Sequence, residues 1–172
     1  MRKLEIGNQK KLGPDWELMD IRPGPDVDVV ADLAEPLPFE DGAFGLIYMS
    51  HVLEHVPWFQ TVDVLREVRR ILKTGGTVEI WVPDFGKIVD AYLSGTIPDD
   101  WRRCNPDGDP MLWCLGRLFG VGGYAQNWHR AGFDEPHLEN CLMQAGFREP
   151  FRLDVPRGVA HGVVNLGLGA RK

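Results

Sequence analysis

Acidic and histidine side chains stand at the ends of several strand-like segments of this sequence. Asp20 and Asp32 each close a short apolar run, and Ser50 and His51 follow a longer one at 44–49. In an open α/β sheet, ligands bind beyond the carboxyl ends of the strands. A carboxylate in that place can accept the hydroxyls of a ribose, and a polar group after the next strand can accept the amino group of an adenine. Together these residues predict a ligand site at one edge of a sheet.

Short segments bounded by Gly, Pro and Asp turns supply such a sheet. Alternating or continuous apolar patterns predict strands at 4–6, 17–21, 27–31, 44–49, 78–82, 151–155 and 164–168. The run 44–49 is apolar at nearly every position, which is typical of a strand buried on both faces. The order of strands and helices predicts an α/β fold with a doubly wound parallel sheet.

Two segments have the apolar spacing of helices. The first has one apolar stripe between 62 and 72, Pro57 suits its first turn, and 73–76 give a basic last turn and a glycine stop. The second is predicted to begin after Asp134, whose side chain can cap it, and to end at Gly146. Helices of this kind would cover the sheet.

Composition limits the class of protein. With 172 residues, 44% hydrophobic and 26% charged, the chain suits one domain over 1–172. The net charge of −6 argues against a nucleic-acid partner, which would need a basic face. No apolar stretch approaches the roughly 20 residues of a membrane span, so we expect a cytoplasmic protein with no membrane partner. Cys104, Cys114 and Cys141 lack C-x-x-C spacing, and we expect neither a disulfide framework nor a metal site.

Three longer stretches resemble a known family. VVADLAEPLPFEDGAFGLIYMSHVLEHV, LREVRRILKTGGTVEIWVPDF and HRAGFDEPHLENCLMQAGF are similar to class I S-adenosylmethionine-dependent methyltransferases, close to the methyltransferase type 11 group. The resemblance covers nearly the whole chain. It implies a seven-stranded Rossmann-like sheet with an antiparallel final strand, and S-adenosylmethionine as a cofactor lying across the strand ends.

The resemblance also implies roles for particular residues. Glu5 and Gly7 fall on the acid and first glycine of the first motif, and Asp20 falls on the acid that binds the ribose. Asp32 and Leu33 fall on the pair beside the adenine. The turn after the fourth strand, beside the methionine part of the cofactor, carries Ser50 and His51.

The glycine-rich loop departs from the family pattern. Gln9 occupies the second glycine position and Lys11 the third, and a Cβ at position 9 keeps the backbone farther from a ligand than glycine would. The distance from Gly7 to Asp20 leaves room only for a turn or a stub of helix, where 13–16 resemble a shortened loop of compact family members. Lys10 or Lys11 is predicted either to meet the carboxylate of the cofactor or to lie in solvent.

The pentapeptide His-Val-Leu-Glu-His at 51–55 suggests a rival chemistry. It matches the H-x-x-E-H pattern of inverted zinc peptidases, in which two histidines of a helix bind zinc and the glutamate is the general base. That pattern needs a sustained helix, whereas here a buried strand precedes it and Pro57 follows closely. A zinc hydrolase with Glu54, Asp84 or His129 as third ligand is retained only as an alternative.

Methyl transfer from a sulfonium is a direct displacement, so the enzyme mainly aligns the reactants and excludes water. A base is needed only where the acceptor must lose a proton, and imidazole suits that task. We name His55 and His129 as candidate catalytic residues.

The stretch 94–130 is rich in Gly, Pro and Trp and weakly periodic, and we expect an insertion that covers the site. Its aromatic side chains would either wall a substrate pocket or fill the loop's own core; they are Trp101, Trp113, Phe119, Tyr124 and Trp128. Without such a cover, a second subunit of a homodimer must close the site, or the site stays open to a larger acceptor.

The predicted function is therefore an S-adenosylmethionine-dependent methyltransferase acting on a small-molecule or glycan-type acceptor, such as a saccharide or carrier-bound molecule. The alternative is a non-catalytic methyltransferase-like partner module, which would explain the missing glycines.

Overall fold

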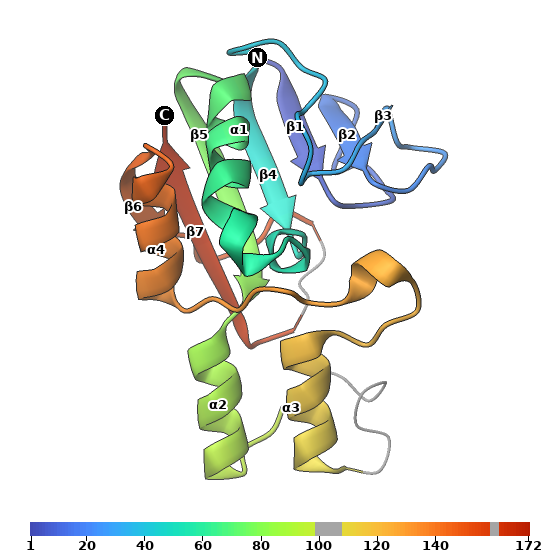
Figure 1. Cartoon of the computed structure of the whole chain (residues 1–172), viewed down its shortest axis with the longest axis vertical. Helices are drawn as coiled ribbons and strands as arrows, with labels where there is room; N and C mark the ends of the chain where they lie inside the picture. Colours follow the sequence, from blue (N-terminus) through green and yellow to red (C-terminus); the bar gives the residue numbers. More distant parts are fainter. Residues whose placement is uncertain (99–107, 159–161) are drawn as a thin grey trace.

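Seven strands form one sheet in the part of the chain that this computed structural model describes, residues 1–98, 108–158 and 162–172 (Figure 1). The strands are β1 (Lys3–Ile6), β2 (Trp16–Asp20), β3 (Val29–Val30), β4 (Phe44–Ser50), β5 (Leu72–Pro83), β6 (Arg148–Arg152) and β7 (Asn165–Arg171). Their order is β3-β2-β1-β4-β5-β7-β6. The first five strands pair in parallel, and β7 runs antiparallel to both β5 and β6. The predicted α/β fold, mostly parallel with an antiparallel final strand, is confirmed.

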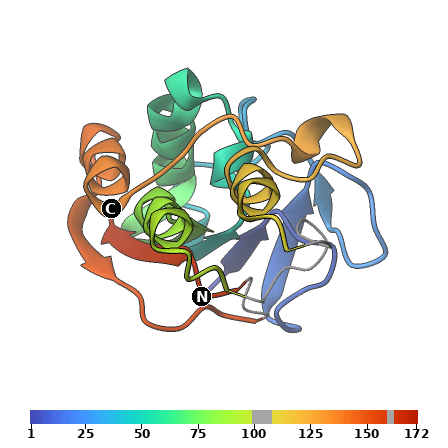
Figure 2. The same cartoon turned by 90° about the horizontal axis from the view of Figure 1, so that it is seen from below.

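Helices α1 (Thr61–Ile71) and α4 (Glu135–Gln144) cover one face of the sheet, and both views show them on the same side (Figures 1 and 2). Alternate residues of β1, β4, β5 and β7 pack against the buried side of these helices in one apolar core. The α4 helix begins as predicted, because the Asp134 side chain accepts a hydrogen bond from His137 N at 2.9 Å.

The α1 helix differs from its prediction at both ends. Pro57 precedes a short 3₁₀ turn, Trp58–Gln60, and the α-helix begins only at Thr61. The helix ends at Ile71, and the next residue is already extended, so 73–76 belong to the start of β5. The glycines at 75 and 76 suggested a helix stop, but pairing with β4 takes the chain into the sheet four residues earlier.

Two further helices lie beyond the carboxyl end of β5 (Figure 1). The first ends where the predicted insertion 94–130 begins, and the second lies within that insertion. They are α2 (Phe85–Ser94) and α3 (Pro110–Phe119), which pack together through a small core that includes Trp113. Local signals for both were present: Asp84 caps Lys87 N, and Asp109 caps Met111 N with Pro110 in the first turn.

Of the two alternatives predicted for the connection from β1 to β2, a turn or a stub of helix, the structure has turns and no helix in residues 7–15. Lys3 lies opposite Trp16, and Ile6 lies opposite Met19. The two strands that carry the predicted ribose end of the site are thus close neighbours in the sequence.

Candidate functional site

A cavity opens at the carboxyl ends of β1, β2 and β4. Its walls come from the ends of β1 and β2, from residues 31–33, from the turn after β4 and from residues 124–130. The predicted site residues Gly7, Asp20, Asp32, Leu33, His51 and His55 all line it. The structure does not bring Glu5, Ser50 or His129 into this cavity.

Gly7 sits at the floor of the cavity in a backbone conformation that favours glycine. Its φ is +88°, and its N–H donates to Met19 O at 2.9 Å. A Cβ at this position would lie 2.6 Å from the Cβ of Val52, which also lines the cavity. Both the turn and the close approach of these two segments therefore require glycine here.

Glu5 holds the shortened loop from beneath. Its buried carboxylate accepts from Asn8 Nδ2 at 2.9 Å and from the Leu12 backbone N–H at 2.8 Å. Burial raises the pKa of Glu5 above its ordinary value, and the two hydrogen bonds oppose that rise. Glu5 thus shapes the loop and does not line the cavity.

Gln9 and Lys11, at the missing glycine positions, are not among the residues that line the cavity. The Gln9 amide reaches Arg22 O at 3.4 Å, and Lys11 Nζ pairs with Asp28 at 2.6 Å. The side chains that replace glycine are directed toward the chain beyond β2, so they leave the cavity open.

Two carboxylates face the cavity after β2 and β3. Asp20 is buried, and its described contacts, with the Arg22 N–H at 2.8 Å and the Arg22 guanidinium at 3.5 Å, both use Oδ1. Asp32 accepts from Ala34 N through Oδ1 at 2.9 Å, and its neighbour Leu33 is buried. Each carboxylate is fixed through one oxygen, which leaves the second for a ligand.

The turn after β4 brings His51 to the cavity. Its φ of 54° is uncommon for a residue with a side chain. Its Nδ1 lies 3.2 Å from Oε1 of Glu54, which is only 1% exposed. Ser50 precedes the turn and, by strand alternation, shares the sheet face of Tyr48, away from the cavity.

His55 and His129 lie side by side, but only His55 lines the cavity. Their ring centroids are 5.0 Å apart. His129 lines a smaller cavity together with Glu54, and burial lowers the pKa of His129. Burial would raise the pKa of Glu54, but His51 and the other two histidines hold it below its ordinary value. The helix that the zinc-peptidase alternative requires is not formed, because 53–55 make a single 3₁₀ turn.

Residues 8–80 match the family model described as "Methyltransferase domain". The demethylmenaquinone methyltransferase of Staphylococcus epidermidis is 24% identical over 98% of this chain and 61% of its own length. A ubiquinone/menaquinone biosynthesis C-methyltransferase, UbiE, of Azotobacter vinelandii is 29% identical over 80% of this chain and 51% of its own. The chain therefore spans about six tenths or less of the length of these relatives.

Solved structures share the fold. The 1,6-didemethyltoxoflavin-N1-methyltransferase of Burkholderia thailandensis, solved with 1,6-didemethyltoxoflavin and S-adenosylhomocysteine, superposes with a TM-score of 0.58 at 18% identity, over 99% of this chain and 70% of its own. The fold is that of an S-adenosylmethionine-dependent methyltransferase. A methyltransferase of Thermotoga maritima gives 0.56 at 19% identity, over 99% of this chain and 82% of its own. The predicted resemblance to the class I methyltransferases is confirmed.

In this methyltransferase fold, residues 124–130 reach back over the cavity. Tyr124, Gln126 and Arg130 line it, and the Arg22 guanidinium lies 4.5 Å from the centre of the Tyr124 ring. This cation–π contact joins the end of β2 to the far end of the predicted insertion.

Of the aromatic residues expected to wall a substrate pocket, Tyr124 lines the cavity at the carboxyl ends of β1, β2 and β4. Trp113 is buried between α2 and α3, while Phe119 and Trp128 are 55% and 50% exposed. Trp101 lies outside the described residues. Sequence reasoning missed Arg22 and Arg130, because no local pattern shows that 22 and 130 meet at one cavity.

No helix in the described part of the methyltransferase fold is long and apolar enough to cross a membrane.

Proposed function

We propose that this chain binds S-adenosylmethionine at the carboxyl ends of β1, β2 and β4 and transfers its methyl group to a small-molecule acceptor. The observation that carries the proposal is the meeting of Gly7, Asp20 and Asp32 at one cavity. These residues come from three different strand ends, and each has the chemistry needed for one part of the cofactor.

The residues have distinct roles in binding. Oδ2 of Asp20 accepts the ribose hydroxyls, since Oδ1 is held by Arg22. Asp32 accepts the adenine amino group, and Leu33 packs against the base. Gly7 lets the cofactor approach the backbone, and His51 lies beside the methionine part.

When bound, the cofactor would supply a methyl group on a positively charged sulfur: the acceptor forms a bond to the methyl carbon, the carbon–sulfur bond breaks, and the thioether S-adenosylhomocysteine leaves. The chain's part is to align the acceptor and to exclude water. We assign the second task to the segment 94–130, because Tyr124, Gln126 and Arg130 already line the cavity. A small-molecule acceptor is supported by the relatives, whose names describe quinone and toxoflavin methylation.

Calorimetric titration with S-adenosylhomocysteine tests the proposal. The wild type is expected to bind one equivalent, and Asp20→Asn is expected to bind about tenfold more weakly, since a charge-assisted hydrogen bond of about 1.5 kcal/mol is lost. Asp26→Asn, in the same connection but outside the cavity, is the matched control and should bind like the wild type.

A folded wild-type protein that gives no binding heat would refute the proposal. Binding without methyl transfer to any of a panel of phenolic, amine and sugar acceptors would instead favour the non-catalytic module. Equal affinities of Asp20→Asn and Asp26→Asn would show that the ribose lies elsewhere.

A further inference from the structure

Three side chains with metal-binding atoms converge in the wall between the two cavities. Glu54, His55 and His129 each place a ligand atom within 4.8 Å of those of the other two. His55 lines the cofactor cavity, whereas Glu54 and His129 line the smaller cavity behind it. From the sequence, zinc at 51–55 is only the lesser alternative, with Glu54, Asp84 or His129 as possible third ligand, and His129 is distant in the chain from the other two.

The hydrogen bonds of the two imidazoles fix which nitrogen can bind a metal. His55 Nδ1 lies 3.3 Å from Trp128 O, and His129 Nδ1 lies 3.1 Å from Arg117 O. A carbonyl oxygen only accepts, so Nδ1 donates in both rings, and Nε2 is the nitrogen left to bind a metal. Metal-binding histidines in proteins are oriented in this way, with the other ring nitrogen donating to a carbonyl or carboxylate.

The buried carboxylate of Glu54 has hydrogen-bonding capacity left over. The residue is 1% exposed, and apart from the 3.2 Å approach of His51 Nδ1 to Oε1, its carboxylate has no hydrogen-bond partner among the described residues. A buried carboxylate is stabilised when each of its oxygens has a polar or charged partner. His51 faces Oε1, and a cation bound at Oε2 would be the partner of the second oxygen.

The backbone holds the cluster together without a metal. Glu54 O accepts from Arg130 N at 2.7 Å and from Ala131 N at 3.1 Å, and His129 N donates to Phe119 O at 3.0 Å. The segment that carries His129 is therefore tied directly to the turn that carries Glu54 and His55. Little rearrangement is needed to bring three ligands to bonding distance.

We infer that Glu54, His55 and His129 bind a divalent transition-metal ion, with Zn²⁺ as the best match. Two imidazoles and one carboxylate suit zinc, whereas Mg²⁺ and Ca²⁺ prefer oxygen ligands throughout. Three protein ligands leave one position of a tetrahedral ion open, as in catalytic zinc sites. This gives His55 and His129 a different role from the proton acceptors predicted from the sequence, and it does not depend on methyl transfer.

The test uses the full chain, stripped with a chelator, dialysed and titrated with ZnCl₂ or CoCl₂. We expect one ion per chain with a Kd of about 1 µM or tighter. The cobalt form should show the visible bands of a low-coordinate site with nitrogen and oxygen ligands, and no sulfur-to-cobalt charge-transfer band. Glu54→Gln, His55→Asn and His129→Asn should each weaken zinc binding by at least about tenfold.

His137→Asn is the matched control. His137 is exposed at the start of α4. Its Nε2 lies 3.8 Å from Cys141 Sγ, so His137 and Cys141 form a second pair of described side chains that could attract zinc. It should leave zinc binding unchanged. The inference is overturned if the folded wild type binds no stoichiometric zinc, if the three cluster variants keep wild-type affinity, or if His137→Asn alone loses the ion. The wild-type cobalt spectrum decides the ligand type even if Glu54→Gln fails to fold.

Discussion

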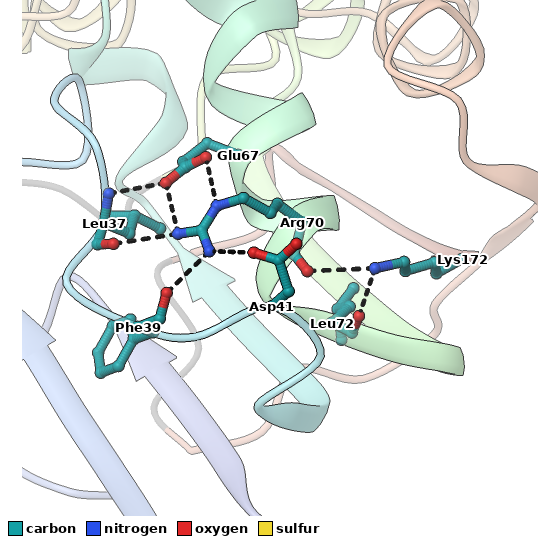
Figure 3. A network of polar contacts seen from close by, with 7 residues as sticks. All are labelled: Leu37, Phe39, Asp41, Glu67, Arg70, Leu72 and Lys172. Atoms are coloured by element: carbon teal, nitrogen blue, oxygen red, sulfur yellow. Dashed lines mark hydrogen bonds and ion pairs between the residues drawn. The ribbon is translucent and has the colours of Figure 1, made fainter.

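At the amino end of the sheet, the Arg70 guanidinium uses all of its hydrogen-bonding capacity within the chain. It makes five hydrogen bonds, two to Glu67 and the others to Leu37 O, Phe39 O and Asp41 (Figure 3). Lys172 Nζ donates to Arg70 O and Leu72 O at the end of α1. This network clamps the segment 37–41 to the helix.

At the carboxyl end, by contrast, Asp20 and Asp32 are each held through one oxygen, and His51 has a left-handed backbone. One oxygen of the buried Glu54 has no hydrogen-bond partner in the part of the chain that the structure describes. Both ends of the sheet carry charged side chains. Arg70 at the amino end makes all of its hydrogen bonds within the chain, whereas the acidic side chains at the carboxyl end do not use all of their oxygens among the described residues. The comparison shows how a structural polar cluster differs from the proposed ligand site, which keeps hydrogen-bonding capacity that the chain itself does not use.

Of the changes at the carboxyl end of the sheet, Gly7→Ala should weaken ligand binding most. The new Cβ would meet Val52 at 2.6 Å in a φ of +88°, which together should destabilise the native turn by about 3 kcal/mol. Relaxation of the turn lowers the population of the binding conformation, so the affinity for S-adenosylhomocysteine should fall by up to roughly a hundredfold. The measurement is calorimetric titration.

Gly75→Ala at the amino end is its control. Its φ of +75° is equally left-handed, but nothing lies within 4 Å of a new Cβ. It should lose about 1 kcal/mol of folding stability and no affinity. Equal loss of affinity in both variants would mean that backbone strain alone, and not the cavity floor, determines binding.

Arg70→Ala should remove the polar network at the amino end of the sheet and destabilise the fold. Loss of five hydrogen bonds, some of them charge-assisted, should lower the free energy of unfolding by about 2 kcal/mol in urea denaturation at neutral pH. Arg66→Ala on the same helix removes an exposed pair with Asp63 and should change stability by about 0.3 kcal/mol or less. A larger loss of stability in Arg66→Ala would show that the Arg70 network stabilises the protein no more than an exposed ion pair on the same helix.

Glu67 makes the same clamp sensitive to acid. The hydrogen bond from Arg70 lowers the pKa of Glu67 below 4.5. Because the folded-state pKa lies below the unfolded value, the stabilisation is fully present above about pH 4.5 and is lost as the pH falls through the folded value. Glu67→Gln should therefore cost about 1 kcal/mol at pH 7 and progressively less below pH 4.5. Thermal denaturation of both proteins across this range measures the difference, and a constant gap would contradict the assignment.

Tyr124→Leu tests the cover over the cavity and should have the smallest effect. Removing the ring beneath Arg22 should cost about 0.5 kcal/mol, which corresponds to about a twofold weaker affinity for S-adenosylhomocysteine. Phe119→Leu, an exposed aromatic change in the same segment, should leave the affinity unchanged. A loss of affinity in Phe119→Leu alone would place the cover on α3.

Sequence reasoning found the parts of the fold that depend on local pattern. The strand β4 and the 78–82 part of β5 show in their mostly apolar runs, and the α4 helix shows in its Asp134 cap. Gly7, Asp20 and Asp32 could be located because each stands at the end of a strand, where the topology of the sheet determines position.

Contacts between distant segments could not be predicted in this way. Arg70 meets 37–41, Arg22 meets Tyr124, and Glu54 meets His129 only because the chain folds back. The direction of the Gln9 and Lys11 side chains could not be predicted either, since the direction of a side chain out of a loop is set by partners such as Asp28 on another segment.

The short link between β1 and β2 has a consequence for the order in which the molecule assembles. Lys3 pairs with the nearby Trp16, whereas Thr77 on β5 must find Arg171 near the other end of the chain. Loop closure over few residues costs less entropy, so low contact order favours early formation of the β1–β2 pair. We expect pulsed hydrogen exchange during refolding to protect the Gly7 amide before those of β7. The nucleotide end of the site would then be in place before the chain has closed its last strand.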